Sequence, residues 1–299
     1  MIDFHDITVR DQRWIEPILH AANKPGADYT FTSMLFWTNY YGQVGRVGDF
    51  VTQYLHWEGR NIYLFPAGQG DLRAAVDAVL DDSLRRGGQT RFRGVTADAQ
   101  AFLEEQYPGR FRFTPYRDSF DYIYTVEELT ELHGKKLQAK RNHCNRFEAA
   151  YPDYRVLPLT ADQLPRCRAF TDEWYRLHFL ENDPADYALE QRAIGLAFDH
   201  FDALGMTGLV LEVEGEVVAF AMGNPIRPDM FDVNFEKARA DMNGPYPMIN
   251  REFARRIAET PYRFLNREDD MGLEGLRRAK ESYIPDLLLE KLLAEELPA

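Results

Sequence analysis

The stretch TGLVLEVEGEVVAFAMGNPI, residues 207–226, decides the fold of the second half of the chain. Two largely apolar runs flank the pair Glu214-Gly215. Runs of strand-forming residues separated by a short turn that contains glycine are typical of a β-hairpin. We therefore predict two antiparallel strands here, with the turn at Glu214-Gly215.

The segments around this hairpin alternate between strand and helix patterns. A strand pattern covers 154–160, and helical periodicity covers 161–179 and 188–205 before the hairpin. After it, the patterns predict a strand at 230–238, a helix at 246–260, a strand at 263–268 and a helix at 273–283. The second half is therefore predicted to be an α+β domain.

The first half repeats this plan without obvious sequence identity to the second. Its hairpin is FVTQYLHWEGRNIYLFPAG, residues 50–68, which turns within residues 58–61. The patterns predict helices at 10–22, 31–42, 70–88 and 97–107, and strands at 90–95, 110–116 and 119–126. We predict an N-terminal domain over 1–130, a basic connecting helix over 131–150 and a C-terminal domain over 151–299.

Composition excludes several classes of protein. The 299 residues carry a net charge of −13, which argues against a surface that wraps nucleic acid as a whole but leaves room for a local basic patch. The two cysteines form no disulfide or zinc pattern, and we predict no metal site. The N-terminus does not read as a secretion signal and no apolar run reaches 18 residues, so we expect a cytoplasmic protein without a transmembrane segment.

Two stretches resemble the signature segments of a known family. DSFDYIYTVEELTELHGKKLQAKRNHCNRF (118–147) and FLNREDDMGLEGLRRAKESYIP (264–285) are similar to segments of an uncharacterised bacterial family related to the C-terminal catalytic domain of phosphatidylglycerol lysyltransferases. The order hairpin, strand, helix, strand, helix also resembles the fold of GCN5-related N-acetyltransferases. The resemblance implies two tandem acyltransferase-like domains, each a mixed, mostly antiparallel sheet flanked by helices, as in Fem-type aminoacyltransferases.

The resemblance also implies a donor. Aminoacyl-tRNA is the donor in the lysyltransferases, and acetyl-CoA is the donor in the acetyltransferases. Acetyltransferases usually hold the CoA pyrophosphate in a glycine-rich loop, but here the corresponding stretch, KARADMNGPYPMIN (237–250), offers only Gly244 for close backbone approach. CoA or acyl-CoA stays a possible cofactor, and none is certain.

The acidic block Glu268, Asp269 and Asp270 is the first candidate for catalysis. A carboxylate at the end of a strand can accept a proton from an attacking amine. The alternative is structural, because acids before a helix compensate the positive end of its dipole. Asn234 and Glu236 are further candidates, since with Asp232 they alternate along one predicted strand. That strand face is either exposed to solvent or part of a substrate cleft.

A local excess of positive charge in 135–146 is the candidate donor site. On a continuous helix, residues four apart share a face, and a basic face can hold a phosphate or a carboxylate. The alternative is a solvated helix between the domains. The candidate residues for donor or anion binding are Lys136, Lys140, Arg141, Asn142 and Asn145, together with Arg277, Lys280 and Tyr283 from the second signature segment.

These observations predict an acyl- or aminoacyltransferase. It would move an activated group from an anionic donor, aminoacyl-tRNA or acyl-CoA, to an amine or hydroxyl of a small-molecule or lipid-like acceptor, in a cleft between or beside the domains. Direct attack on a carbonyl needs positioning and a base, which suits a site with carboxylates and amides. The alternatives are a CoA-dependent N-acetyltransferase and a non-catalytic anion-binding module.

Overall fold

A computed structural model describes residues 1–178 and 184–298. The contacts divide the chain into two compact units, which are described separately below. The first unit comprises residues 1–121, 269–273 and 288–299, and the second comprises residues 122–268 and 274–287. The chain therefore passes between the units four times.

The first unit is built on a mixed sheet with the strand order β1-β2-β3-β4-β6-β15-β7, to which β5 adds by pairing with β3. Helices α4 and α5 supply apolar side chains to its core, where Val76, Leu103 and Phe92 are fully buried. The elements of this unit are β1 (Phe4–His5), η1 (Val9–Asp11), α1 (Gln12–Ala22), η2 (Ala27–Tyr29), α2 (Phe31–Phe36), α3 (Thr38–Tyr41), β2 (Gln43–Val47), β3 (Phe50–Trp57), β4 (Arg60–Leu64), β5 (Ala67–Gly68), α4 (Leu72–Arg85), β6 (Thr90–Val95), α5 (Ala97–Gln106), β7 (Phe111–Pro115), η3 (Arg117–Ser119) and β15 (Leu292–Glu296).

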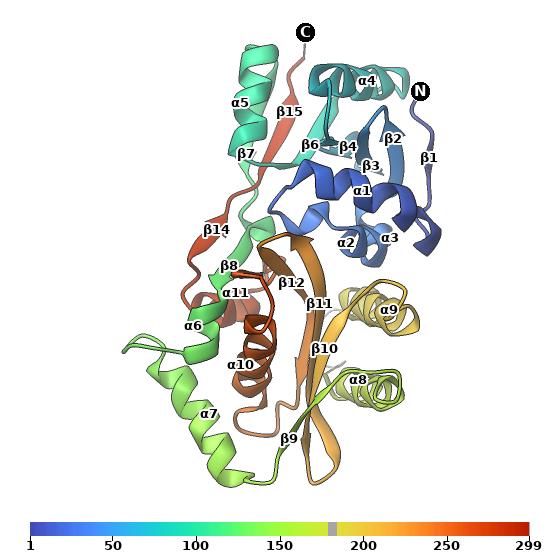
Figure 1. Ribbon diagram of the computed structural model, residues 1–299. Coiled ribbons are helices and arrows are strands. Elements are labelled where there is room, and N and C mark those ends of the chain that lie inside the picture. Colours follow the sequence, from blue (N-terminus) through green and yellow to red (C-terminus); the bar gives the residue numbers. More distant parts are fainter. Residues whose placement is uncertain (179–183, 299) are drawn as a thin grey trace. The chain divides into compact units, whose positions relative to one another are not determined.

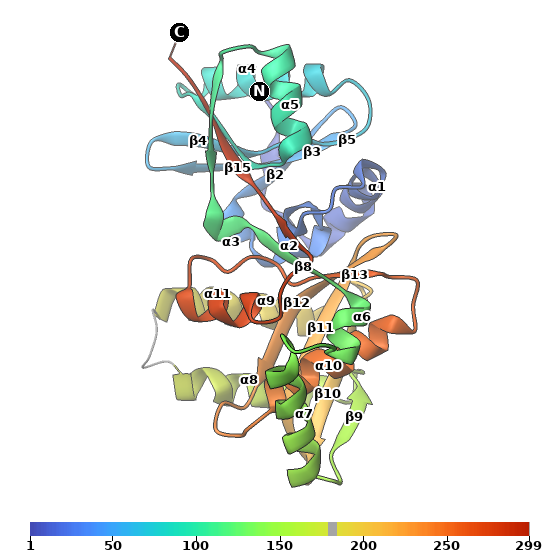
Figure 2. The same cartoon turned by 90° about the vertical axis from the view of Figure 1, so that its left-hand side faces the viewer.

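The strand β15 returns from the C-terminal end of the chain into the first sheet (Figures 1 and 2). It lies between β6 and β7 and pairs antiparallel with both of them. The sequence predicts a C-terminal domain over all of 151–299 and no strand after residue 283, and β15 differs from both expectations. Local pattern does not reveal this return, because the strand is specified by its two neighbours in the sheet.

The second unit is built on a sheet with the order β14-β8-β13-β12-β11-β10-β9. Helix α10 packs on one face and α8 and α9 cover the other (Figure 1), where Phe170 and Phe198 contact Phe220 of β11. Its elements are β8 (Asp121–Thr125), α6 (Val126–Glu131), α7 (Gln138–Ala150), β9 (Arg155–Pro158), α8 (Leu164–His178), α9 (Pro184–Asp199), β10 (Thr207–Val213), β11 (Glu216–Arg227), β12 (Met230–Ala238), α10 (Pro245–Ala258), β13 (Phe264–Asn266), α11 (Glu274–Glu281) and β14 (Leu287–Leu289).

Both predicted hairpins are present. Glu58-Gly59 joins β3 to β4, and Glu214-Gly215 joins β10 to β11. All four turn residues have positive φ, between 49° and 84°, which matches the turn type whose twist suits two-residue hairpins. The predicted fold class, an α+β chain with two mostly antiparallel sheets flanked by helices, is confirmed.

The predicted connecting helix over 131–150 is wrong in its first part. Helix α6 ends at Glu131, where Leu132 takes a left-handed conformation with φ 51°. Gly134 also has a positive φ, and the next helix, α7, begins only at Gln138. These two residues leave the helical region, so the helical period of the sequence does not continue across them.

The central strand β12 contains a bulge. Met222 of β11 pairs with Phe235, but Asn224 pairs with Asp232, so one residue of β11 lies opposite two of β12. That residue is Gly223, where an added Cβ would lie 1.8 Å from the carbonyl oxygen of Asp232. Bulges re-aim side chains and are common beside functional sites. Here the two residues of β12 that lie opposite Gly223 are Val233 and Asn234, so the bulge includes a candidate site residue.

Candidate functional site

The candidate site lies in the second unit, where two parallel strands part. β12 pairs with β13 over three residues only, from Met230 with Phe264 to Asp232 with Asn266. β12 then continues to Ala238 without β13 beside it. Beyond this point, side chains of β12 contact Arg267 and Glu268, which follow β13. The sheet topology therefore brings the end of β12 and residues 267–268 together.

A buried amide joins two carboxylates at this opening. Nδ2 of Asn234 donates to Oδ2 of Asp232 at 3.1 Å and to Oε1 of Glu268 at 3.2 Å. Asp232 is fully buried, Asn234 is 7% exposed, and Glu268 is only partly buried. The predicted alternative of a solvent-exposed strand face is therefore wrong. Of the two acidic residues in this group, Glu268 is the one that is partly exposed.

A second group lies one step further along β12. Nη2 of Arg267 lies 3.2 Å from Oε1 of Glu236, and Nδ2 of Asn250 donates to Oε2 of the same carboxylate at 3.1 Å. Burial alone would lower the pKa of Arg267, but the Glu236 carboxylate together with Tyr124 and Tyr283 outweighs that effect and raises the pKa. We call Asp232, Asn234, Glu236, Asn250, Arg267 and Glu268 the polar network.

Cations and one aromatic ring border the network. Nζ of Lys140 lies 4.2 Å from the centroid of the Tyr283 ring, and Cζ of Arg267 lies 5.0 Å from the same centroid. Burial and the charge of Arg267 lower the pKa of Lys140, and burial raises the pKa of Tyr283. The two sequence stretches that resemble family signatures therefore meet at Tyr283, and two positive charges flank its ring.

The backbone around Glu268 is fixed by hydrogen bonds. Its N–H donates to Oδ1 of Asn266 at 2.8 Å, and its carbonyl accepts from the N–H of Tyr122 at 3.1 Å. Glu268 has a φ of 55°, a left-handed conformation that is uncommon outside glycine. Nζ of Lys280 donates to the neighbouring carbonyl of Arg267 at 2.5 Å. The carboxylate is thus held by a rigid support, which a positioned base requires.

The predicted acidic block is divided between the two units. Glu268 belongs to the second unit, whereas Asp269 and Asp270 belong to the first. Oδ2 of Asp270 accepts from Nη1 of Arg117 at 2.9 Å, and its Oδ1 accepts from the N–H of Gly272 at 2.9 Å. Asp270 is fully buried and stabilises the turn that follows it.

The predicted basic face on 135–146 is only partly formed. Lys136 precedes the first residue of α7 and does not share a helical face with Lys140. Nη1 of Arg141 donates to the carbonyls of Leu132 and Gly134, which closes the loop before α7. The remaining candidates of this stretch, Asn142 and Asn145, are exposed. Of the stretch, Lys140 is the residue that reaches the network border.

The C-terminal candidates for donor binding also separate. Tyr283 and Lys280 are buried beside the network, 5% and 7% exposed. Arg277 is partly exposed on α11. Sequence reasoning did not select Arg267, Asn250 or Asp232 as site residues. Two signals in the sequence could have indicated them. Arg267 lies next to the acidic block, and Asn250 is a polar residue among the apolar residues of α10.

The start of α10 is the position at which acetyltransferases hold a pyrophosphate. Gly244 caps this helix, and Pro245 and Pro247 supply no N–H in its first turn. The N–H of Met248 donates to the carbonyl of Gly244 at 3.0 Å. A Cβ on Gly244 would lie 2.9 Å from the carbonyl oxygen of His143 in α7. In the first turn this leaves the N–H of Tyr246, and the residues present do not fit a pyrophosphate cradle.

Other chemistries have little support in the described residues. Cys144 is fully buried, and burial raises its pKa to about 11, so its thiol stays protonated at neutral pH. In residues 1–178 and 184–298, no three His, Cys, Asp or Glu residues are grouped so that they could hold a metal ion. No described helix is both long and apolar enough to cross a membrane.

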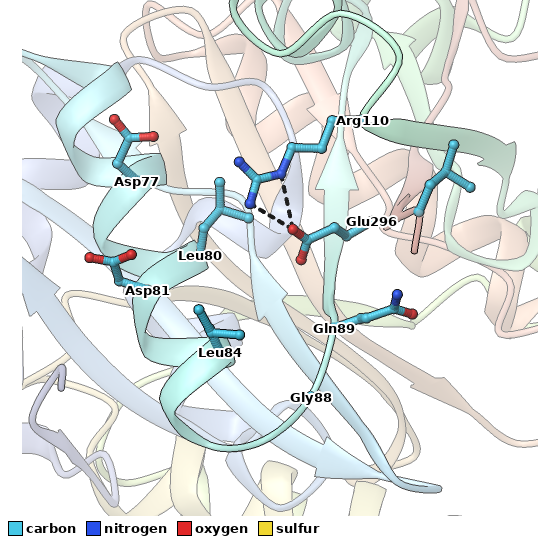
Figure 3. Close-up of a pocket in the computed structure, with 9 residues that line it drawn as sticks. Asp77, Leu80, Asp81, Leu84, Gly88, Gln89, Arg110 and Glu296 are labelled. Carbon is cyan, nitrogen blue, oxygen red and sulfur yellow. Dashed lines mark hydrogen bonds and ion pairs between the residues drawn. The ribbon is translucent and has the colours of Figure 1, made fainter. Parts of the chain in front are cut away.

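A surface hollow of about 350 Å³ lies elsewhere, in the first unit (Figure 3). Its polar wall is an ion pair, in which Nε and Nη2 of Arg110 donate to Oε1 of Glu296 at 2.9 and 2.7 Å. Leu80 and Leu84 of α4 line it beside Asp77 and Asp81. None of its lining residues belongs to the polar network, so the hollow does not mark the candidate site.

Known proteins resemble this chain over nearly its whole length. A family model described as "Phosphatidylglycerol lysyltransferase, C-terminal" matches residues 20–295, which confirms the resemblance inferred from the two signature stretches. A crystal structure of a conserved protein of unknown function from Bacteroides thetaiotaomicron is 39% identical, covers 99% of this chain and 100% of its own, and has a TM-score of 0.92.

Two further matches are more distant. The C-terminal domain of a putative lysylphosphatidylglycerol synthetase from Agrobacterium fabrum shares the fold, with a TM-score of 0.71 at 15% identity, and the match covers 97% of this chain and 92% of that domain. An uncharacterized protein of Mycoplasmoides gallisepticum is 26% identical over 186 residues, which are 60% of this chain and 57% of that protein. The chain therefore matches little more than half of this curated relative.

Proposed function

This chain belongs to the family described as phosphatidylglycerol lysyltransferase, C-terminal, and from that premise we propose that it is an aminoacyltransferase. Its donor would be an aminoacyl-tRNA and its acceptor an amine or hydroxyl of a small molecule or a lipid-like molecule. The observation that carries the proposal is the polar network at the parting of β12 and β13. In it, Asn234 holds the partly exposed Glu268, and Glu236, two positions further along β12, pairs with the guanidinium of Arg267.

Each reacting group has a counterpart in the network. The acceptor amine or hydroxyl attacks the ester carbonyl of the donor, and Glu268 accepts its proton. Arg267 polarises the carbonyl oxygen, because a fixed positive charge stabilises the negative charge that develops there. A new bond forms to the acyl carbon, the bond to the ribose oxygen breaks, and that oxygen leaves as the tRNA hydroxyl after it takes up a proton. No covalent enzyme intermediate is needed.

The cations at the border suit an anionic donor. Lys140 and Arg267 flank the ring of Tyr283, so phosphate groups of the donor end can approach two positive charges beside the reacting ester. A CoA thioester is a less suitable donor, because two prolines occupy the first turn of α10 and α7 packs on Gly244. We therefore propose aminoacyl-tRNA over acyl-CoA.

Thermal unfolding with added donors tests the proposal. We would add acetyl-CoA, a mixed pool of aminoacyl-tRNA, and the same tRNA uncharged. A ligand at about 100 times its Kd stabilises a protein by about 2.7 kcal/mol, which raises the Tm by several degrees. The proposal predicts a larger shift with the charged pool than with uncharged tRNA. A shift with acetyl-CoA alone would favour acetyl transfer, and no shift at all would favour a different function.

A further inference from the structure

One face of the first sheet holds three arginines against one carboxylate. Glu295 of β15 lies between Arg91 of β6 and Arg112 of β7 in the strand register. Its Oε2 accepts from Nη2 of Arg112 at 2.6 Å. Its Oε1 accepts from Nη1 of Arg60 on β4 at 2.6 Å and from Nη2 of Arg91. Three positive charges against one negative charge leave a local excess of positive charge, in a chain whose net charge is −13.

These residues share the face of the sheet that is opposite to α4 and α5. Side chains alternate along a strand, and Phe92, next to Arg91, belongs to the core to which α4 and α5 contribute. Arg60 is two positions before Ile62 on β4, and Ile62 pairs with Arg91, so Arg60 lies on the same face as Arg91. The pairing of β15 with both β6 and β7 places Arg112 there as well.

Two of the three arginines are exposed and keep spare donors. The side chains of Arg60 and Arg112 are 54% and 64% exposed, whereas that of Glu295 is 16% exposed. A guanidinium carries five N–H donors, and within residues 1–178 and 184–298 one donor of each of these two arginines is hydrogen-bonded. An exposed ion pair contributes little to stability, so holding β15 in the sheet does not require three arginines. The remaining donors can bind an anion from solution.

An exposed aromatic ring lies beside the arginines. Trp57, the last residue of β3, is 61% exposed and pairs with Arg60 in the strand register. Residues directly opposite one another in an antiparallel pair project from the same face of the sheet. An exposed indole ring can stack on a nucleobase of any kind. We call Trp57, Arg60, Arg91 and Arg112 the arginine face.

The partner that this surface suits is a phosphate backbone. The planar fork of a guanidinium matches the oxygens of a phosphate group. Cations beside an aromatic ring are typical of surfaces that bind nucleic acid. A membrane surface is bound through exposed apolar area as well as through charge, and the arginine face offers a single ring. A nucleic acid is therefore favoured over a lipid surface.

We propose that the arginine face binds the phosphate backbone of tRNA. This inference rests on the proposed function in one respect, because the proposed donor identifies the nucleic acid as tRNA. It goes beyond that function by assigning a contact to the first unit, which contains none of the residues of the polar network.

The salt dependence of binding tests the inference. Uncharged tRNA carries the whole phosphate backbone, and its equilibrium binding to the wild-type protein would be measured over a range of KCl concentrations. Each phosphate contact contributes about −0.7 to −0.9 to the slope of log K against the logarithm of the salt concentration. Three arginines on the backbone therefore predict a slope of about −2 or steeper.

Single substitutions locate the contacts. Arg60→Gln and Arg112→Gln should each make the slope shallower by about 0.7 to 0.9, because each removes one phosphate contact. Trp57→Ala should weaken binding by about tenfold at every salt concentration and leave the slope unchanged, because stacking involves no phosphate. Arg46→Gln, at an exposed arginine of the same unit that pairs with Asp49, is the matched control and should bind like the wild type. Circular dichroism of each variant verifies that it is folded.

Three results would overturn the inference, and they can be told apart. If the wild type binds tRNA and none of the substitutions in the arginine face weakens that binding, the inference is wrong and the proposed function stands. If the substitutions weaken binding to vesicles of phosphatidylglycerol but not to tRNA, the arginine face is a membrane surface instead. If the wild type binds neither charged nor uncharged tRNA, the proposed function is contradicted as well.

Discussion

The side chain of Asn234 on β12 lies 3.2 Å from the carboxylate of Glu268, which follows β13. Thirty-four positions separate the two residues in sequence, and they meet because the parallel strands β12 and β13 part immediately before them. This hydrogen bond connects the two strands at the place where backbone pairing ends. The account of function depends on it, because it fixes the carboxylate that would take the proton.

The first prediction concerns that carboxylate. Glu268→Gln keeps the shape and the contact to Asn234 but removes the proton acceptor, so transfer should fall by about 10²–10⁴-fold. The Tm should change little. Glu259→Gln, at an exposed glutamate paired with Arg256 in the same unit, should retain activity. Wild-type turnover by Glu268→Gln would remove Glu268 from the mechanism; donor binding should be unchanged in either variant.

The second prediction concerns the bulge. In Gly223→Ala the new Cβ would lie 1.8 Å from the Asp232 carbonyl oxygen, so β11 and β12 must move apart. Overpacking of this kind costs about 1–3 kcal/mol, and the displaced network should lose transfer activity. Gly275→Ala on α11 meets no atom within 4 Å and serves as the control. Urea unfolding and an activity assay on both variants would test this, and an active, fully stable Gly223→Ala would show that the bulge is not needed.

The third prediction concerns the return of the C-terminal segment to the first unit. Nζ of Lys291 is 2.7 Å from Oδ1 of Asp121 and also contacts Asp28, and all three side chains are buried. Lys291→Met would leave two buried carboxylates with one partner fewer and should cost about 3–5 kcal/mol of unfolding free energy. Arg46→Met, which removes the exposed pair with Asp49, should cost less than about 1 kcal/mol. If both variants lost the same unfolding free energy, the ion pairs of Lys291 would not be what holds the C-terminal segment in the first unit.

The same ion pair makes stability depend on pH. Burial alone would raise the pKa of Asp28, but Lys291 and Arg93 outweigh it and hold the pKa below its ordinary value of 3.8. A carboxyl with a depressed folded-state pKa stabilises the fold above its unfolded pKa and loses that contribution as the pH falls through the folded value. Urea unfolding of the wild type should therefore show a loss of stability on acidification below about pH 4. Asp28→Asn should have a lower unfolding free energy than the wild type at neutral pH and should lose less of it on acidification. If both proteins lost the same amount of unfolding free energy, Asp28 would not be the source of the pH dependence.

The fifth prediction separates the mechanism from thiol chemistry. Burial raises the pKa of Cys144 to about 11 and that of Cys167 to about 12, and neither is exposed. Both thiols should resist iodoacetamide at pH 8 in the native protein and react fully in urea. Mass spectrometry of the labelled protein measures this directly. Rapid native labelling of Cys144 would restore it as a candidate nucleophile.

The parts of the fold that local sequence specifies were predictable. Both hairpins follow from a Glu-Gly turn between apolar runs, and the amphipathic helix α4 was predicted from its period and the glycines after it. β15 was not predictable, because its leucines and glutamates form a strand only through pairing with β6 and β7. The bulge in β12 was equally invisible, since it depends on register against Gly223. Tertiary pairing decides these elements, not propensity.

The candidate site divides in the same way. Asn234, Glu236 and Glu268 were selected from the sequence. The structure pairs Asn234 with Glu268, and Glu236 with Asn250 and Arg267. Asp270 looked equivalent to Glu268 in sequence, but it faces Arg117 in the first unit because the boundary between the units falls after Glu268. The residue types and their positions on strands therefore suggested which side chains could take part in catalysis. Which of them lie close together depends on where β12 and β13 stop pairing, and the sequence does not reveal that position.

The central claim is tested most directly by following an amino acid from donor to acceptor. A pool of radiolabelled aminoacyl-tRNA is incubated with the wild-type protein or Glu268→Gln, together with a mixture of soluble amines and phospholipid vesicles, and the label is measured in each acceptor fraction. The account predicts transfer of label by the wild type to an amine or hydroxyl acceptor, and a loss of about a hundredfold or more in Glu268→Gln. Label that stays on tRNA with the wild type, or equal transfer by both proteins, would contradict it.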